Sequence, residues 1–351
     1  MPGSIIAASK SEYRAARDRA LPPIRKIGAN TWVLPLQINF PNGSVPYTLC
    51  YVLKDAEGWI HLIDPGVDDD ANLGRIAAFL QSIGSDVSRI RSSIATHLHM
   101  DHLPMALRLR AETGAAVVMH ERDSAGVGHE FDFLDDAVLL RWGVPPDERL
   151  GLASLRSKRR TSSPPDRADR VLEGGDLLTI TGRDVEVLWT PGHTPGHICL
   201  IDRGEGLVFT GDHVLPDINP GLGLGDGCNN PLDQYFDSLE RISLFDDLVV
   251  CPGHGYLFHG LATRCSQIYA HHQKRAVDVA HVLETHPDLT TWEVAKRVPW
   301  TGGWDRLAGF KLTSALAQTE MHAARVRNQQ QSARRTSELR TTSPRCPASG
   351  H

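Results

Sequence analysis

The sequence predicts an α/β fold in which two β-sheets pack together beneath outer helices, followed by a small helical domain. Three observations support this prediction. Short runs rich in β-branched and aromatic residues occur in two separate parts of the chain. Segments with helical periodicity lie between those runs. From about residue 261 onwards, the pattern is that of helices.

The first half of the chain supplies the first set of strands. A helical lead-in over residues 1–25 precedes the strand candidates TWVLPL, YTLCYVL and GWIHLIDPG, which are separated by the turn sequences PNG and DAEG. Helical spacing follows in DDDANLGRIAAFLQSIG, with Asp at the start and Gly84 at the end. A strand at IRSSIAT, a helix at about 104–113 and a strand at AAVVMH complete this half.

The second half supplies the second set of strands. Its apolar runs are LLTI, DVEVLWT, HICLI and GLVFTGD, and a helix at 232–245 then leads to a last strand in LVVCPGHG. Because elements that are apolar on one face must bury that face, we expect the strands of both halves to form two packed sheets. Together they define a main domain over residues 26–260.

Residues 121–170 differ in character from both halves. The stretch FDFLDDAVLLRWGVPPDERL predicts two helices, and RSKRRTSSPPDRADR predicts a loop. A long insertion with little strand character is often a lid or a binding loop, for which the apolar candidates are Phe131, Phe133 and Trp142. The alternative is a surface excursion in which these residues only pack helices, and the sequence leaves both open.

The C-terminal part predicts a helical domain over residues 261–328. It contains the periodic stretch QIYAHHQKRAVDVAHVL, a capping box formed by Thr290 and Glu293, and a helix at about 306–327. The remaining residues, 329–351, are polar and rich in Ser, Thr and Arg, which predicts a disordered tail.

Composition excludes several classes of protein. The formal net charge of −5 over 351 residues argues against a general nucleic-acid-binding surface. No apolar stretch reaches membrane-spanning length, and the N-terminus lacks the apolar core of a signal peptide. The six cysteines are scattered without a CxxC pair, as in a reducing compartment, so we expect a cytoplasmic protein that does not bind membranes. They are Cys50, Cys199, Cys228, Cys251, Cys265 and Cys346.

Histidine and aspartate are concentrated where predicted strands end. Three histidines and one aspartate lie between positions 97 and 102, directly after the strand IRSSIAT. Further candidates follow other strands beside Gly or Pro, where the backbone can turn sharply, so that side chains from several strand ends can converge. They are His193, His197, Asp212, His213 and His254. Neutral imidazole and carboxylate bind borderline divalent metals, so this pattern predicts a metal site.

These motifs resemble those of the metallo-β-lactamase fold superfamily. The HxHxDH motif is formed by His97, His99, Asp101 and His102, LIDPG contains Asp64, and TPGHTPGHICL is similar to the equivalent stretch of glyoxalase II-like members. The resemblance covers about residues 30–260. It implies an αββα four-layer sandwich with a dinuclear metal site at one edge, and hence a catalytic role for the main domain.

Carried over residue by residue, the resemblance implies two sets of ligands and a bridge. His97, His99 and His193 would hold the first metal; Asp101, His102 and His254 would hold the second, with Asp212 between them. Asp64 would steady the ligand loop. His197 and His213 are either hydrogen-bond donors behind the ligands or structural histidines. The same ligands accept zinc, manganese or iron, and zinc is the expected ion.

One position departs from the family pattern. Small residues, often Gly-Gly, usually follow the last histidine of the motif, whereas Leu103 and Pro104 stand here. Proline is well tolerated in the first turn of a helix, so the ligands are expected to be preserved while the pocket beside that helix differs.

The resemblance implies hydrolysis by a metal-bound hydroxide, with Asp101 holding a metal and orienting the nucleophile. A thioester or lactone is the expected substrate, because the TPGHTPGHICL motif is glyoxalase II-like and the lid candidates are apolar. A phosphodiesterase or ribonuclease of the same fold is the alternative, and a non-catalytic binding module is another. The phosphodiesterase alternative would use two basic runs, Arg156, Lys158, Arg159 and Arg160, and Arg325, Arg327, Arg334 and Arg335.

The helical C-terminal part looks like the helical or winged-helix-like extension of one branch of the superfamily, which includes thioesterases and a β-lactamase-like ribonuclease. Apolar faces on its helices would suit a homodimer.

Overall fold

The computed structural model describes residues 4–39, 45–127, 134–153, 167–223 and 230–341, with side chains described as far as 329. The chain divides into two compact units. The first comprises Met1–Asp135 and Ser154–His271, and the second comprises Asp136–Ala153 and His272–His351.

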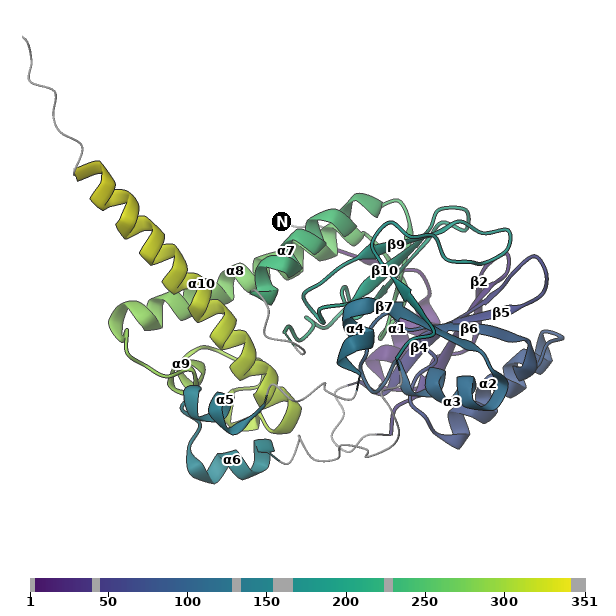
Figure 1. The fold of residues 1–351 in the computed structure, drawn as a ribbon, viewed down its shortest axis with the longest axis horizontal. Helices are drawn as coiled ribbons and strands as arrows, with labels where there is room; N and C mark the ends of the chain where they lie inside the picture. Colours follow the sequence, from purple (N-terminus) through teal and green to yellow (C-terminus); the bar gives the residue numbers. More distant parts are fainter. Residues whose placement is uncertain (1–3, 40–44, 128–133, 154–166, 224–229, 342–351) are drawn as a thin grey trace, which may run out of the picture. The chain divides into compact units, whose positions relative to one another are not determined.

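The first unit contains two mixed sheets (Figure 1). In the seven-stranded sheet, β2 to β5 are antiparallel neighbours and β5 to β8 are parallel neighbours. Its strands are β2 (Arg25–Gly28), β3 (Thr31–Gln37), β4 (Tyr47–Lys54), β5 (Ile60–Ile63), β6 (Ile90–Ile94), β7 (Ala116–His120) and β8 (Arg170–Leu172).

The six-stranded sheet has the order β1-β13-β12-β11-β10-β9. Its neighbours β11 and β12 are parallel, and its other pairs are antiparallel. The strands are β1 (Ile6–Ala7), β9 (Val185–Trp189), β10 (Ile198–Asp202), β11 (Leu207–Gly211), β12 (Val249–Pro252) and β13 (Phe258–His259).

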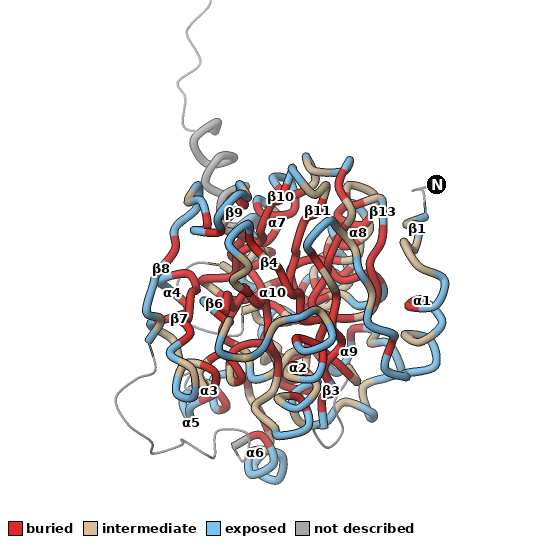
Figure 2. The backbone as a smooth tube through the Cα atoms, turned by 90° about the vertical axis from the view of Figure 1, so that its right-hand side faces the viewer, coloured by how far each residue is buried: buried red, intermediate tan, exposed pale blue. Residues whose placement is uncertain are grey.

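The main core lies between the two sheets. Tyr51 of β4 and Phe209 of β11 meet edge to face at 5.0 Å within one apolar cluster that draws on both sheets. Strands β4, β5, β10 and β11 are buried along almost their whole length, as Figure 2 shows for β4 and β11. Because both faces of these strands are covered, their sequences are continuous apolar runs rather than alternating ones.

Helices cover the outer faces. A second apolar cluster joins β3, β4 and β5 to α2 (Asp70–Ser82) and α3 (Pro104–Thr113). On the other side, α7 (Pro231–Ile242) lies beside β9 and β10 in Figure 1, and its Ser238 donates a hydrogen bond to the Pro191 carbonyl. The expected αββα sandwich is therefore confirmed.

The N-terminal lead-in is more than a helix. A short strand, β1, pairs with β13 before α1 (Lys10–Arg17) begins. The buried Glu12 of α1 then forms an ion pair with Arg25 at 2.6 Å.

The prediction of a strand at LLTI is wrong. Only isolated bridges form there, between Leu177 and Glu186 and between Ile180 and Arg183. Gly182, with φ of 79°, turns the chain so soon after Ile180 that no ladder can develop.

The second unit is helical. It contains α5 (Asp136–Arg141), α6 (Pro146–Ala153), the C-terminal part of α8 (Leu261–Thr285), α9 (Thr291–Arg297) and α10 (Gly309–Thr341). The two helices predicted in the insertion and the capping box of Thr290 and Glu293 are confirmed. The described residues 261–341 contain no strand, so the helical expectation holds and a β-wing is absent there.

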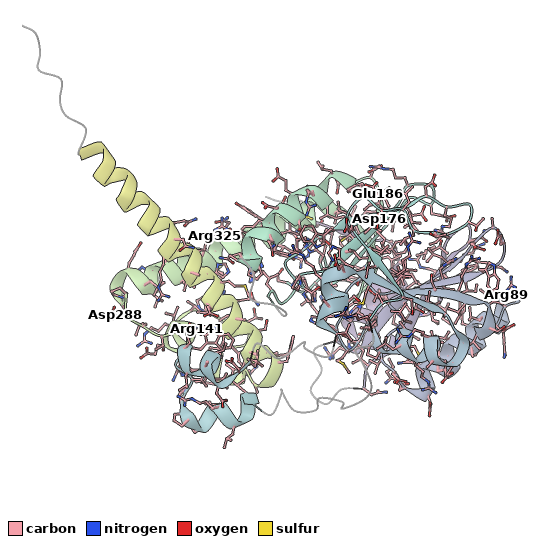
Figure 3. The ribbon with its side chains drawn as sticks, viewed as in Figure 1. Arg89, Arg141, Asp176, Glu186, Asp288 and Arg325 are labelled. Carbon is pink, nitrogen blue, oxygen red and sulfur yellow. The ribbon has the colours of Figure 1, made fainter. Side chains whose placement is uncertain are left out.

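Side-chain contacts tie the inserted helices to α10. Trp142 is buried and donates its indole N–H to Glu320 at 2.7 Å, and Arg141, labelled in Figure 3, forms an ion pair with the same carboxylate at 3.0 Å. Helix α10 extends past its predicted end near 327 into the region expected to be disordered, because no Gly or Pro interrupts the sequence before Pro344. The predicted domain boundaries themselves stay a prediction.

Four of the six cysteines fall within the described residues. Cys50, Cys199, Cys251 and Cys265 are free and buried, while Cys228 and Cys346 lie outside the described residues. Within the described ranges, no helix combines the length and the apolar composition that crossing a bilayer requires.

Replacing Gly192 by alanine should destabilise the protein by about 3 kcal/mol, since a side chain there is both strained and overpacked. Gly192 has φ of 138°, and an added Cβ would lie 2.5 Å from Tyr235 Cβ and 2.7 Å from its Cα. Urea unfolding followed by circular dichroism measures the change. The control is Gly74→Ala in α2, where nothing lies within 4 Å of an added Cβ and a gain of up to about 1 kcal/mol is expected. Equal stabilities for the two variants would contradict this account.

Candidate metal centre

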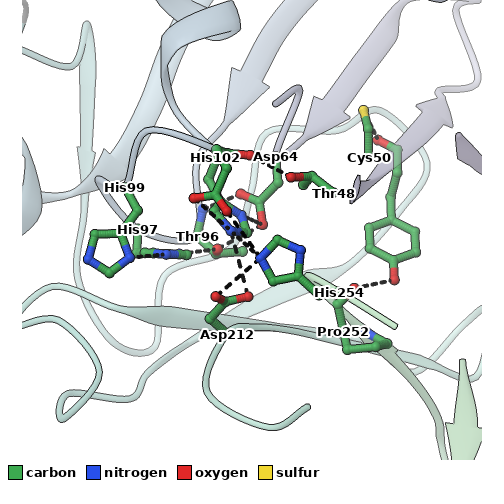
Figure 4. A network of polar contacts seen from close by, with 12 residues as sticks. Thr48, Cys50, Asp64, Thr96, His97, His99, His102, Asp212, Pro252 and His254 are labelled. Atoms are coloured by element: carbon green, nitrogen blue, oxygen red, sulfur yellow. Dashed lines mark hydrogen bonds and ion pairs between the residues drawn. The ribbon is translucent and has the colours of Figure 1, made fainter. Parts of the chain in front are cut away.

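The predicted ligands lie at one edge of the sandwich, in loops that follow four strands. The loop after β6 contains His97, His99, Asp101 and His102; the loop after β9 contains His193; Asp212 follows β11, and His254 follows β12. The four strands end at the same edge of the sandwich, so the loops that follow them bring together residues that are far apart in sequence. Figure 4 shows Asp212 and His254 facing His102.

His97, His99 and His193 form the first group of possible ligands, with their ligand atoms within 4.8 Å of one another. His99 Nδ1 lies 3.0 Å from His97 Nε2 and 3.2 Å from His193 Nε2. Around a tetrahedral zinc ion with Zn–N distances of about 2.0–2.1 Å, neighbouring ligand atoms are about 3.3 Å apart. The spacing of the three nitrogens therefore fits a shared cation.

Asp101, His102 and His254 form a second group. His254 Nε2 lies 3.3 Å from His102 Nε2 and 3.3 Å from Asp101 Oδ2. Thr48 Oγ1 donates a hydrogen bond to the Asp101 carbonyl at 2.7 Å, which holds the backbone of the loop against β4.

Asp212 lies between the two groups. Its carboxylate oxygens are 3.3 Å from His254 Nε2, 3.6 Å from His102 Nε2 and 3.9 Å from His193 Nε2. One carboxylate thus reaches ligand atoms of both groups, as a bridging ligand must.

Hydrogen bonds on the far side of the imidazoles determine which nitrogen faces the centre. His193 Nδ1 donates to the Gly221 carbonyl at 2.6 Å, and His254 Nδ1 donates to the Tyr47 carbonyl at 2.8 Å. With the single proton of each neutral ring used in this way, Nε2 presents a lone pair to the centre. Lone pairs that face one another need a cation between them, so the donor set fits a bound metal.

Asp64 holds two further rings, those of His97 and His102. It accepts hydrogen bonds from the Thr96 backbone N–H at 2.7 Å and from Thr96 Oγ1 at 2.8 Å, and His102 Nδ1 lies 3.0 Å from its Oδ2. Because Thr96 Oγ1 gives its proton to Asp64, it accepts from His97 Nδ1 at 3.0 Å. The backbone of Asp64 lies in the left-handed region, at φ of 51°, and its role in steadying the ligand loop stays a prediction that these contacts support.

His197 and His213 belong to neither ligand group. Both are buried, with ring centroids 5.5 Å apart. His197 Nδ1 lies 2.9 Å from Thr190 Oγ1, whereas neither nitrogen of His213 has a hydrogen-bond partner among the described residues. They lie behind the ligands, where both roles considered from the sequence would place them.

Burial and charge move the pKa values of the ligands in opposite directions. Burial lowers the pKa of His99 to about 3 and also lowers the pKa values of His97 and His193, which keeps these rings neutral. Burial acts in the same sense on His102 and His254, but the neighbouring carboxylates outweigh it and raise both pKa values. A metal ion must therefore compete with protons for the second group.

Other residues singled out in the sequence lie outside the described residues or in the second unit. Phe131, Phe133 and the basic run at 156–160 lie outside the described residues, as do the side chains of Arg334 and Arg335. Trp142 has the contacts of a packed residue of the second unit. Its lid role stays a prediction.

Sequence reasoning missed Thr48, Thr96 and Asp123. Thr48 and Thr96 hold ligand backbones and rings through their hydroxyls, and the buried Asp123 accepts hydrogen bonds from the ligand loops. None has the spacing of a metal ligand. Backbone groups, which leave no signal in the sequence, are among their partners, such as the Asp101 carbonyl and the Leu98 N–H.

Comparison with protein families supports the motif assignment. The sequence model of a family described as the metallo-beta-lactamase superfamily matches residues 43–254. This range contains all seven residues of the two groups and the bridge.

Several named proteins are similar to the chain. Lactamase-like protein nscB of Aspergillus fumigatus is 24% identical over 303 residues, which cover 83% of this chain and 74% of that protein. Hydroxyacylglutathione hydrolase GloC of Haemophilus influenzae is 27% identical and covers 59% of this chain and 84% of its own length. The atrochrysone carboxyl ACP thioesterase of Aspergillus fumigatus is 27% identical, over 51% of this chain and 57% of that protein.

Two solved structures are similar over most of the chain. A metallo-beta-lactamase family protein from Thermus thermophilus matches with a TM-score of 0.68 and 25% identity, covering 86% of this chain and 94% of that one. A beta-lactamase domain protein from Burkholderia ambifaria matches with a TM-score of 0.70 and 22% identity, covering 91% of each. The second likeness shows the fold alone.

Replacing Asp64 by asparagine should weaken metal binding by about 10- to 100-fold, because an amide cannot accept from both Thr96 and His102 as the carboxylate does. Asparagine tolerates the left-handed backbone, so the fold should persist. Zinc titration of metal-stripped protein measures the affinity. Asp55→Asn is the matched control, since Asp55 is also a buried carboxylate that faces a histidine, His61, at 3.4 Å. Unchanged affinity in Asp64→Asn would contradict the assigned role.

The metal-free protein should lose stability as the pH falls from 7 to 5. Histidines whose pKa is lowered on folding bind protons more readily in the unfolded chain, so stability falls below their ordinary pKa of 6.5. Five histidines of the centre behave in this way, and two have raised pKa values and act in the opposite sense, being stabilising below 6.5. The five are His97, His99, His193, His197 and His213, and the two are His102 and His254.

Thermal unfolding of protein stripped with a chelator, at pH 7, 6 and 5, measures this effect. A His99→Asn variant removes one of the five groups and should show a smaller fall in Tm. A Tm that rises on acidification would show that the two raised pKa values dominate instead.

Proposed function

The chain belongs to the metallo-beta-lactamase superfamily, a superfamily of metallo-hydrolases, and on this premise we propose that it uses two divalent ions to hydrolyse a thioester or a lactone. The observation that carries the proposal is the convergence of two ligand groups on one shared carboxylate, that of Asp212. Imidazole and carboxylate ligands suit zinc, and also manganese or iron.

The residues around the centre have distinct parts in this reaction. Two bound divalent ions would lower the pKa of a water molecule and polarise the substrate carbonyl. Asp101 Oδ2 lies 3.3 Å from His254 Nε2 and Oδ1 lies 3.7 Å from His102 Nε2, so Oδ1 is the oxygen in looser contact and would orient the attacking water. At 20% exposed, the Asp101 side chain is the more accessible of the two carboxylates at the centre, against 12% for Asp212.

An acyl substrate is supported by the similar proteins. Two of them are named a hydroxyacylglutathione hydrolase and an ACP thioesterase, and both names describe hydrolysis of acyl compounds. The rival phosphodiester substrate would need a basic surface, and the net charge of −5 disfavours one. We therefore place the acyl substrate first and nucleic acid second.

Further parts of the proposal concern the rest of the chain. We propose a catalytic domain over residues 26–260, with substrate selection by the insertion at 121–170, followed by a C-terminal helical domain. Zinc as the working ion, a homodimer and a cytoplasmic location complete the proposal. The insertion carries Trp142, whose indole is held by Glu320, so any part that it has in substrate binding would depend on that contact.

A paired activity screen tests the proposed function. Metal-loaded protein is given acyl-thioesters and aliphatic lactones in one arm, and single-stranded RNA and bis(nitrophenyl) phosphate in the other. We expect turnover in the acyl arm and a loss of kcat/KM of about a thousandfold or more in Asp212→Ala, because the bridging carboxylate serves both ligand groups.

The matched control is Asp217→Asn. Asp217 lies on the same loop as Asp212 but accepts a hydrogen bond from Tyr256, and this variant should retain full activity. Cleavage confined to the phosphodiester arm and abolished in Asp212→Ala would replace the acyl substrate by nucleic acid. Two bound metals without turnover in either arm would contradict the acyl assignment and leave the metal centre in place.

A further inference from the structure

A buried carboxylate outside the two ligand groups joins two of the ligand loops. Asp123 lies on the short helix α4 (Glu121–Gly126), directly after β7, and its side chain is fully buried. Its Oδ2 accepts hydrogen bonds from the Leu98 backbone N–H at 3.0 Å and from Thr194 Oγ1 at 2.7 Å. Its Oδ1 accepts a third from the Gly196 backbone N–H at 2.5 Å.

The three donors belong to the loops that carry the first ligand group. Leu98 stands between His97 and His99, and Thr194 directly follows His193. A peptide unit is planar, so an N–H held in one direction fixes the Cα atoms on both sides of it. The hydrogen bond to Leu98 therefore restrains the backbone from which His97 and His99 project, and the bonds to the second loop restrain His193 relative to them.

The second loop is shaped to admit this carboxylate. A Cβ atom at position 196 would lie 2.7 Å from Asp123 Oδ1 and 2.8 Å from Asp123 Cβ, well inside van der Waals contact. Only glycine lets the backbone approach so closely. Because charge-assisted hydrogen bonds are shorter and stronger than neutral ones, the ionised carboxylate is a firm link between the two loops.

We infer that Asp123 is a positioning residue that sets how tightly, and in what geometry, the His97, His99 and His193 group binds a divalent ion. Asp123 belongs to none of the possible ligand groups, so it acts through the loops and not as a ligand. The inference rests on the proposed function, because it requires that the group binds a metal. It adds a residue that neither the motif pattern nor the family resemblance assigns.

Cobalt binding tests the role of Asp123 without an activity assay. Metal-stripped, full-length protein is titrated with Co²⁺, and the visible absorption bands report the coordination geometry while competition with Zn²⁺ gives the affinity. In Asp123→Asn, an amide replaces one oxygen and turns a donor toward the donors of the loops. We expect about 10- to 100-fold weaker binding of one equivalent and a shifted spectrum for that equivalent, with a far-ultraviolet circular dichroism spectrum like that of the wild type.

Two variants make the outcome decisive. Thr194→Val removes one of the three donors and should change the spectrum in the same direction by a smaller amount, which preserves the test if Asp123→Asn does not fold. Asp55→Asn is the control, because Asp55 also accepts two backbone N–H groups, those of Glu57 and Trp59, but is not bonded to the ligand loops; it should bind Co²⁺ like the wild type.

Two results would overturn the inference, and they can be told apart. If folded Asp123→Asn or Thr194→Val binds Co²⁺ with the affinity and spectrum of the wild type, the positioning role is wrong while the metal centre stands. If the wild type itself takes up no Co²⁺, the proposed metal centre is wrong, and the inference falls with it.

Discussion

Lone pairs of imidazole and carboxylate converge at one edge of the sandwich, and the surrounding structure is arranged to hold them there. His97 Nε2 and His193 Nε2 both point at His99 Nδ1 from about 3 Å, although their own protons are directed elsewhere. Such an arrangement is unfavourable without a cation, so each ring has to be fixed from behind. Asp64, the Tyr47 carbonyl and the Gly221 carbonyl provide that support, and each comes from a different segment of the chain.

The sheets explain how such distant segments can cooperate. In the parallel part of the first sheet, β6 ends where the HxHxDH loop begins, and in the second sheet β11 and β12 run parallel and end at Asp212 and just before His254. Tyr47, at the start of β4, meets His254 from the opposite sheet. The packing of the two sheets therefore sets the distance between the ligand groups, and the core between the sheets is part of the metal centre's support.

Candidate ligands leave a signature in the sequence. His and Asp at strand ends, beside Gly or Pro, gave nine candidates, and the resemblance to the superfamily separated the seven that the structure brings together from His197 and His213. Supporting groups have no such signature. A carbonyl such as that of Gly221 belongs to every residue type, and Asp123 stands three residues after the end of β7 with nothing in its spacing to distinguish it from a surface aspartate.

Secondary structure was predictable where local chemistry decides it, as in the capping box of Thr290 and Glu293. Secondary structure was not predictable where it depends on contacts with distant parts of the chain or on the length of a stretch without Gly or Pro. The short strand β1 forms because β13 lies beside it. The LLTI stretch forms only isolated bridges and no continuous ladder, because the chain turns at Gly182 directly after it. The polar composition after residue 328 concealed a helix that no Gly or Pro interrupts.

The second unit is assembled from two pieces of chain that are made at different times. Helices α5 and α6 leave the ribosome well before α9 and α10, yet Trp142 is buried only when α10 supplies Glu320. During synthesis, an apolar segment in the middle of the chain therefore stays exposed until the C-terminal helices have been synthesised. Loss of the C-terminal helices would thus leave behind a protein with an uncovered apolar surface, and so a substrate for chaperones and proteases rather than a smaller enzyme.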